Sequence, residues 1–166
     1  MNTPTSQVRE LAERITEAHA TIAVAESLTG GQLSSALAAA PDASDWFRGG
    51  LVAYAPEVKF DVLGVTPGPV VTAPCAEEMA TGIERLLTAR VGVGVTGVGG
   101  PDPEEGRPAG TVFAAVSTQG RVVVREWHFD GEPEEVLEQT IDAIIRLVQA
   151  ELSRPHPAAD TRGGRS

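Results

Sequence analysis

Ser27 and Thr29 are the residues of this sequence whose type and position best suit chemistry. They stand between a β-type run, Thr21 to Ala25, and a helix-favouring tract, Gln32 to Ala40, and Gly30-Gly31 directly precedes that tract. Free backbone N–H groups converge at the start of a helix, and glycine lets a ligand approach them closely. A hydroxyl beside such donors can act as a nucleophile next to an oxyanion hole. The alternative is that one of the two hydroxyls only caps the helix.

Two further groups of polar residues follow predicted strands. Tyr54 and Lys59 follow one strand, and Thr96 ends another, before a glycine-rich loop that contains Gly97 and Gly100. Ligands of open α/β sheets bind at the ends of the strands, so we expect these residues to line one pocket together with the serine. The amine of Lys59 should then lie near hydrogen-bond reach of the serine or of Tyr54.

The histidines and the cysteine do not join these groups. His19 ends the first predicted helix, His128 lies in a late hairpin, and His156 is in the C-terminal tail, so a Ser/His/Asp triad is not expected. With Cys75 as the only cysteine, no metal-ligand spacing is present. We therefore expect neither a metal nor a cofactor.

Lys59 is the remaining base for the serine. A lysine can take a serine proton if burial lowers its pKa so that the amine is neutral, and Tyr54 could relay that proton. Spacing alone favours a plainer interpretation, in which Lys59 is a solvated helix lysine and Tyr54 an aromatic residue at the rim. The hydroxyl of Thr96 would then cap its own turn.

Helices and strands must alternate to place these residues together. Periodicity and turn signals predict helices over Ser6–Ala20, Gln32–Ala40, Pro56–Leu63, Thr72–Leu87 and from Pro133 onwards, and strands over Thr21–Ala25, Trp46–Tyr54, Val91–Thr96, Thr111–Val116 and Arg121–Phe129. The strict valine–glycine alternation of Val91–Thr96 indicates a buried strand that another element approaches closely. This order predicts an α/β fold with a mixed sheet covered by helices. We expect a single domain over residues 6–152 and a disordered tail over 153–166.

Composition restricts the partners and the compartment. The 166 residues suit one globular domain, and the net charge of −10 argues against a nucleic-acid or anionic-membrane partner. This charge does not exclude a small anionic ligand, because backbone amides can bind one locally. A single cysteine and the lack of a signal-peptide or membrane-spanning segment predict a cytoplasmic protein. A small-molecule substrate is expected, and a homo-oligomer (a dimer or larger) is left open.

Several motifs stand in a recognisable order. They are Ala25-Glu26-Ser27-x-Thr29-Gly30-Gly31, Trp46-Phe47 with Tyr54 and Lys59, Leu63-Gly64-Val65, Thr96-Gly97-x-x-Gly100-Pro101, and Pro108-x-Gly110-Thr111-Val112. From about Val8 to Val148, the sequence resembles the C-terminal domain of the competence/damage-inducible protein CinA and its stand-alone relatives, nicotinamide-nucleotide amidohydrolases. The resemblance implies a three-layer α/β/α fold and hydrolysis of the carboxamide of nicotinamide mononucleotide, with release of ammonia. It also implies that Ser27 is the nucleophile, that Lys59 and Tyr54 assist it, and that Thr96 lines the pocket.

The chain departs from the family pattern at three positions. Family members usually carry Asn where this chain has Pro56, and typically two arginines where it has Pro133 and Leu137. If those arginines hold a substrate phosphate, this chain has lost charge-assisted hydrogen bonds to it.

Two hypotheses from different classes follow from the sequence. The first is a metal-independent amidohydrolase that deamidates nicotinamide mononucleotide, in which Ser27 attacks, Lys59 takes the proton and backbone amides of Thr29, Gly30 and Gly31 hold the oxyanion. The second is a catalytically silent module that binds a nucleotide or a partner in the same cradle. A redox enzyme with a dinucleotide site is set aside, because the Gly-x-Gly-x-x-Gly pattern is missing.

Overall fold

A mixed five-stranded sheet forms the middle of the molecule. The computed structural model describes residues 6–155, and its strands occur in the order β2-β1-β3-β4-β5. Their bounds are Ile22–Glu26 (β1), Phe47–Val52 (β2), Val91–Gly97 (β3), Thr111–Thr118 (β4) and Arg121–His128 (β5). β1 pairs in parallel with both β2 and β3, whereas β4 is antiparallel to β3 and β5. The carboxyl ends of β1, β2 and β3 therefore meet at one edge of the sheet.

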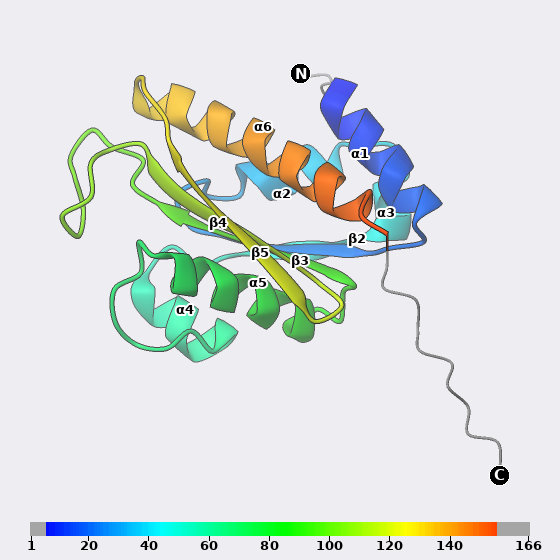
Figure 1. The fold of residues 1–166 in the computed structure, drawn as a ribbon, viewed down its shortest axis with the longest axis horizontal. Helices are drawn as coiled ribbons and strands as arrows, with labels where there is room; N and C mark the ends of the chain where they lie inside the picture. The colour runs from blue at the N-terminus through cyan, green and yellow to red at the C-terminus, as the bar shows by residue number, and fades with distance from the viewer. Residues whose placement is uncertain (1–5, 156–166) are drawn as a thin grey trace, which may run out of the picture.

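Helices cover both faces of this sheet (Figure 1). The helices are Ser6–Glu17 (α1), Gln32–Ala38 (α2), Ala43–Trp46 (α3), Pro56–Leu63 (α4), Ala73–Leu86 (α5) and Pro133–Leu152 (α6). α1, α2, α3 and α6 lie on one side, and α4 and α5 on the other, so the three-layer α/β/α fold expected from the sequence is confirmed. One large apolar cluster fills the first interface and two smaller ones fill the second.

The glycines of β3 explain how closely α5 packs on the sheet. A Cβ atom at Gly92 would lie 2.2 Å from the carbonyl oxygen of Ala80, and one at Gly94 would lie 2.4 Å from that of Ala76. Real Cβ atoms do not come so near to backbone oxygens, so only glycine admits the helix here. The close approach predicted from the valine–glycine alternation is therefore made by α5.

Element boundaries follow the predictions to within a few residues, with one helix missed. The Gln119-Gly120 turn joins β4 to β5 as predicted, with positive φ at both residues, as a two-residue hairpin requires. The first helix ends at Glu17 rather than Ala20, and His19 has a positive φ of 50°. α3 was not predicted, because Trp46 was assigned to the start of the following strand; in the structure Trp46 ends this short helix and is buried in the core.

The C-terminal tail predicted as disordered is described only at its start. Ser153 ends α6, and its hydroxyl donates to the carbonyl oxygen of Gln149 at 2.9 Å. Arg154 lies 3.3 Å from the Glu151 carboxylate. These residues therefore extend the contacts of α6, and residues 156–166 lie outside the described part. No helix within residues 6–155 is long and apolar enough to cross a membrane.

Candidate active site

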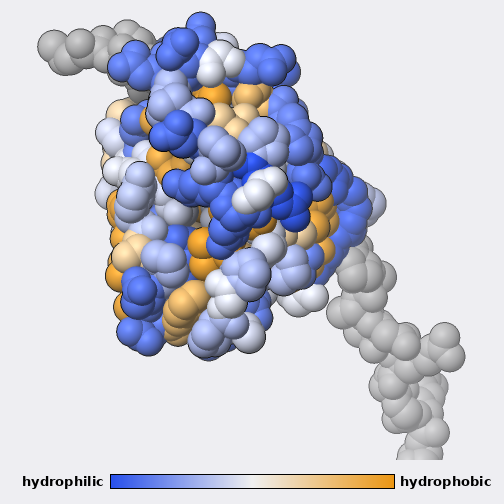
Figure 2. Space-filling view, turned by 90° about the vertical axis from the view of Figure 1, so that its left-hand side faces the viewer, coloured by the Kyte–Doolittle hydropathy of each residue, from blue (hydrophilic) through white to orange (hydrophobic). Residues whose placement is uncertain are grey.

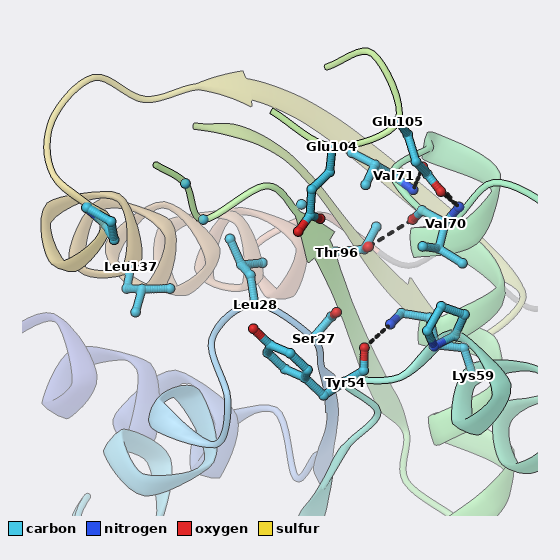
Figure 3. Close-up of a pocket in the computed structure, with 15 residues that line it drawn as sticks. Ser27, Leu28, Tyr54, Lys59, Val70, Val71, Thr96, Glu104, Glu105 and Leu137 are labelled. Atoms are coloured by element: carbon cyan, nitrogen blue, oxygen red, sulfur yellow. Dashed lines mark hydrogen bonds between the residues drawn. The ribbon is translucent and has the colours of Figure 1, made fainter. Parts of the chain in front are cut away.

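A pocket of about 500 Å³ opens where the three parallel strands end (Figure 3). Its lining comprises Ser27, Leu28, Tyr54, Pro56, Lys59, Val70, Val71, Thr96, Gly97, Gly99, Gly100, Glu104, Glu105, Pro133 and Leu137. Ser27 directly follows β1, Tyr54 lies two residues beyond β2, and Thr96 is the penultimate residue of β3. The prediction that these three side chains and Lys59 line one pocket is confirmed. The volume is typical of a small-molecule site.

The predicted cradle of Thr29, Gly30 and Gly31 lies outside this lining. The N–H of Gly30 already donates to the carbonyl oxygen of Ser27 at 3.1 Å. Thr29 is fully buried, and its hydroxyl has no hydrogen-bond partner within residues 6–155. These residues form the turn that carries Ser27, and the Gly30 amide is used within that turn.

Glu26 occupies the start of the helix that was expected to hold a ligand. Its carboxylate is fully buried and accepts hydrogen bonds from the N–H of Leu33 at 2.8 Å, and from the N–H and hydroxyl of Ser34 at 3.0 and 2.7 Å. A carboxylate is stabilised there by the free amides and the helix dipole. Glu26 therefore fixes α2 to the end of β1 and holds Ser27 between them. Sequence analysis did not predict this role of Glu26, because its partners Leu33 and Ser34 lie seven and eight residues further along the chain.

Replacing Glu26 tests this anchoring. Glu26→Ala should lower the free energy of unfolding by about 3 kcal/mol, because two buried amides and a hydroxyl lose their acceptor. Glu26→Gln keeps one oxygen and should cost about half as much. Urea unfolding of both variants measures the difference. An alanine variant as stable as the wild type would show that the anchor contributes nothing.

Lys59 lies on the floor of the pocket. The simpler interpretation of the sequence, a solvated lysine on a short helix, is therefore wrong. Only 1% of its surface is exposed. Its amine donates to the carbonyl oxygens of Ala53 at 2.7 Å and Tyr54 at 3.2 Å. Burial lowers the pKa of Lys59 below its ordinary 10.5, against the smaller opposing effects of Cys75 and of nearby carboxylates. Burial thus shifts Lys59 towards the neutral amine, the form that a general base requires.

Tyr54 holds Lys59 through its backbone, and its ring points away from the amine (Figure 3). The side chain is 71% exposed and stands at the rim of the pocket. Its hydroxyl therefore faces the space that a ligand would enter. Its assignment as a proton relay stays a prediction.

The wall opposite Lys59 is built from two loops that are tied together. Thr96 donates its hydroxyl to the carbonyl oxygen of Val70 at 2.8 Å. The Glu105 carboxylate accepts from the N–H groups of Val70 and Val71, at 2.8 and 2.7 Å. Glu104, next to it, turns its carboxylate into the pocket (Figure 3). Sequence reasoning missed both glutamates, because nothing in a polar loop indicates which carboxylates face inwards.

Cys75 is the other nucleophilic side chain near Lys59. Burial raises the pKa of its thiol to about 11, and the positive charge of Lys59 only partly offsets this rise. The thiol is therefore protonated near neutral pH, and Cys75 is not part of the pocket lining, whereas Ser27 is. Within residues 6–155, no group of three or more His, Cys, Asp and Glu side chains is placed to hold a metal ion.

Comparison with known proteins supplies the family. The family model of the CinA C-terminal domain matches residues 5–152. This chain belongs to the CinA C-terminal domain family. Competence-damage inducible proteins of Bacillus subtilis and Desulforamulus reducens are 42% and 38% identical to it, over 76% and 82% of the chain. The chain spans about a third of the length of these two relatives, 32% and 34%.

Solved structures of CinA proteins share the whole fold. Competence damage-inducible protein A of Klebsiella pneumoniae superposes with a TM-score of 0.89 at 29% identity, covering 93% of this chain and 100% of that one. The corresponding protein of Enterobacter asburiae gives 0.88 at 31%, covering 92% and 100%. The CinA domain described here therefore corresponds to the full length of those solved chains.

The face of this CinA domain that Figure 2 shows is mainly hydrophilic. At the end of the molecule shown in Figure 2, polar residues form the outer layer and apolar ones are recessed between them. Pro133 and Leu137 belong to the apolar part of the pocket lining. They are the two positions where the resemblance led us to expect arginines. In this chain α6 thus presents an uncharged wall to the pocket.

Proposed function

We propose that this chain is an amidohydrolase of the nicotinamide-nucleotide type, which converts a ring carboxamide to a carboxylate and ammonia. The observation that carries the proposal is that Ser27 and Lys59, a buried lysine of lowered pKa, line the same cavity. Lys59 is also the one lysine of the sequence, so no other side-chain amine can replace it.

In the first half of the reaction, the Ser27 hydroxyl attacks the carboxamide carbon. The two carbonyl oxygens that bind the Lys59 amine engage two of its hydrogens, which leaves the nitrogen lone pair of the neutral amine to take the serine proton. The tetrahedral intermediate then collapses as the carbon–nitrogen bond breaks. The proton passes from Lys59 to the leaving nitrogen, directly or through the Tyr54 hydroxyl. Ammonia departs, and the acyl group stays on Ser27 as an ester.

In the second half, water opens this ester. Neutral Lys59 takes a proton from the water as its oxygen attacks the acyl carbon, and the same proton returns to the Ser27 oxygen as the ester bond breaks. The products are the ring carboxylate and ammonia, which takes up the remaining proton, and the serine is restored. One water is consumed for each amide.

The developing oxyanion needs backbone donors that face the cavity. Leu28, Gly99 and Gly100 line the pocket, and their N–H groups take no part in the hydrogen bonds found within residues 6–155. An N–H directly after the nucleophile is a common member of an oxyanion hole. We therefore assign the oxyanion to these amides, in place of those of Thr29 to Gly31.

Ammonia release from nicotinamide mononucleotide and from its dephosphorylated nucleoside, nicotinamide riboside, tests the proposal. The purified wild-type chain should release ammonia from at least one of them, with and without a chelator. If it hydrolyses neither, the binding-module hypothesis takes its place. The uncharged wall of Pro133 and Leu137 favours that hypothesis, because a changed ligand wall is expected where catalysis has been lost.

A further inference from the structure

The pocket offers little positive charge to a ligand. Among the described residues that line it, Lys59 has the only cationic side chain, whereas Glu104 and Glu105 supply two carboxylates. The Lys59 amine is bound to two backbone carbonyl oxygens on the floor, and burial lowers its pKa. A phosphate monoester, which carries close to two negative charges at neutral pH, would therefore meet net negative potential here.

Two helix starts near the pocket, those of α6 and α2, carry the chain's own carboxylates. α6 begins at Pro133, which has no N–H, and in its capping box the Glu135 carboxylate accepts from the N–H of Glu132 at 2.7 Å. Glu134 adds another carboxylate to this turn. At α2, the Glu26 carboxylate occupies the corresponding position. Free amides at a helix start can bind phosphate, but at these two starts the chain places its own carboxylates instead.

The nearest arginine of the pocket loops is also engaged elsewhere. Arg107 lies 3.6 Å from the Glu126 carboxylate, and its guanidinium carbon sits 5.2 Å from the centre of the Phe113 ring. Both contacts place it over the β4–β5 surface, and it is not part of the pocket lining. Binding a phosphate through Arg107 would require both contacts to break.

We propose that this site selects a positively charged aromatic carboxamide that carries no phosphate, such as a pyridinium nucleoside. The inference rests on the proposed function and specifies its substrate class. The Glu104 carboxylate faces the cavity, where it attracts a pyridinium cation (Figure 3). The exposed Tyr54 ring at the rim can stack on that cation, and Leu137 supplies an apolar wall for the ring and sugar.

Binding measured apart from turnover tests the selection. Calorimetric titration of the Ser27→Ala variant with nicotinamide riboside should give a dissociation constant at least about fivefold lower than that for nicotinamide mononucleotide. Equal or tighter binding of the mononucleotide would overturn the inference, and so would failure of both ligands to bind. This binding measurement does not depend on turnover. If the wild type proves inactive, the proposed function is wrong, but the comparison of the two affinities still tests the inference.

A charge placed on the α6 wall should reverse the preference. In the Ser27→Ala background, Leu137→Arg should tighten nicotinamide mononucleotide about tenfold and leave the riboside unimproved, because a guanidinium can bind the phosphate. Leu137→Gln, of similar length but uncharged, is the matched control and should improve neither ligand. A similar gain for both ligands in the arginine variant would contradict the inference.

The contribution of the Glu104 carboxylate to this selection can be tested separately. Glu104→Gln should weaken binding of the riboside about threefold and strengthen binding of the mononucleotide. The same carboxylate attracts the pyridinium cation of the first ligand and repels the phosphate of the second. Glu13→Gln removes an exposed carboxylate from α1, far from the pocket, and should change neither affinity. If Glu104→Gln leaves both affinities at the wild-type values, Glu104 does not select the ligand and the inference fails.

Discussion

Ser27→Ala should lower the rate of ammonia release at least about a thousandfold, because among the described lining residues the Thr96 hydroxyl is engaged by the Val70 carbonyl oxygen and the exposed Tyr54 hydroxyl stands at the rim. The fold should survive the change. Ser27 is only 9% exposed, but its hydroxyl forms no hydrogen bond with other residues in the range 6–155, so its removal leaves no buried partner unsatisfied. The substitution therefore separates chemistry from structure more cleanly than any other change in this pocket.

The measurement compares kcat for ammonia release with the thermal unfolding midpoint of the same preparation. Ser35→Ala is the matched control, because Ser35 is an exposed serine on the neighbouring helix α2. It should retain wild-type kcat. Turnover by Ser27→Ala at a tenth of the wild-type rate or more would remove Ser27 as the nucleophile, whichever substrate is used.

Much of the fold could be predicted because its signals are local. The alternating glycines of β3, the proline at the start of α4 and the Gln119-Gly120 turn each restrict the backbone within a few residues. The parallel strand ends then bring Ser27 and Thr96 to one edge of the sheet without any knowledge of side-chain contacts.

The parts of the site that could not be predicted depend on contacts between distant segments. Glu26 reaches amides seven and eight residues ahead, and Glu105 binds the amide of Val70, 35 residues earlier in the sequence. The expectation of an oxyanion cradle at the start of α2 did not anticipate that Glu26 already fills it. Burial of Lys59 likewise depends on the packing of α4 against α5, which the spacing of the lysine in the sequence does not reveal.

Lys59→Met should reduce turnover nearly as far as Ser27→Ala does, because the chain has no other lysine and no histidine among residues 6–155 lines the pocket. Methionine is similar in length and suits a side chain that is 1% exposed, but it cannot accept a proton. The wild-type rate should rise with pH through the lowered pKa of Lys59, since only the neutral amine is a base. A rate that is flat across the neutral and alkaline range would argue against Lys59 as the base.

The same protonation should also change stability. Folding lowers the pKa of Lys59 below 10.5 through burial, so between the folded and unfolded pKa values the unfolded chain binds more protons than the folded one. The free energy of unfolding contributed by Lys59 must then increase with pH across that window. Below the folded pKa both states are protonated, and the full cost of burying the charge is present. Above 10.5 both are neutral, and the cost is gone.

Urea unfolding of the wild type and of Lys59→Met over a pH series isolates this contribution, because other titrating groups are common to both proteins. The stability of the wild type relative to the variant should increase as pH rises. Since Lys59 is the one lysine, selective ¹³C labelling of lysine gives a single side-chain signal whose titration reads its pKa directly. A titration at or above 10.5, with a pH-independent stability difference, would show that the amine is charged at neutral pH. Lys59 would then anchor the carbonyl oxygens of Ala53 and Tyr54 as a cation, and Ser27 would need a different base.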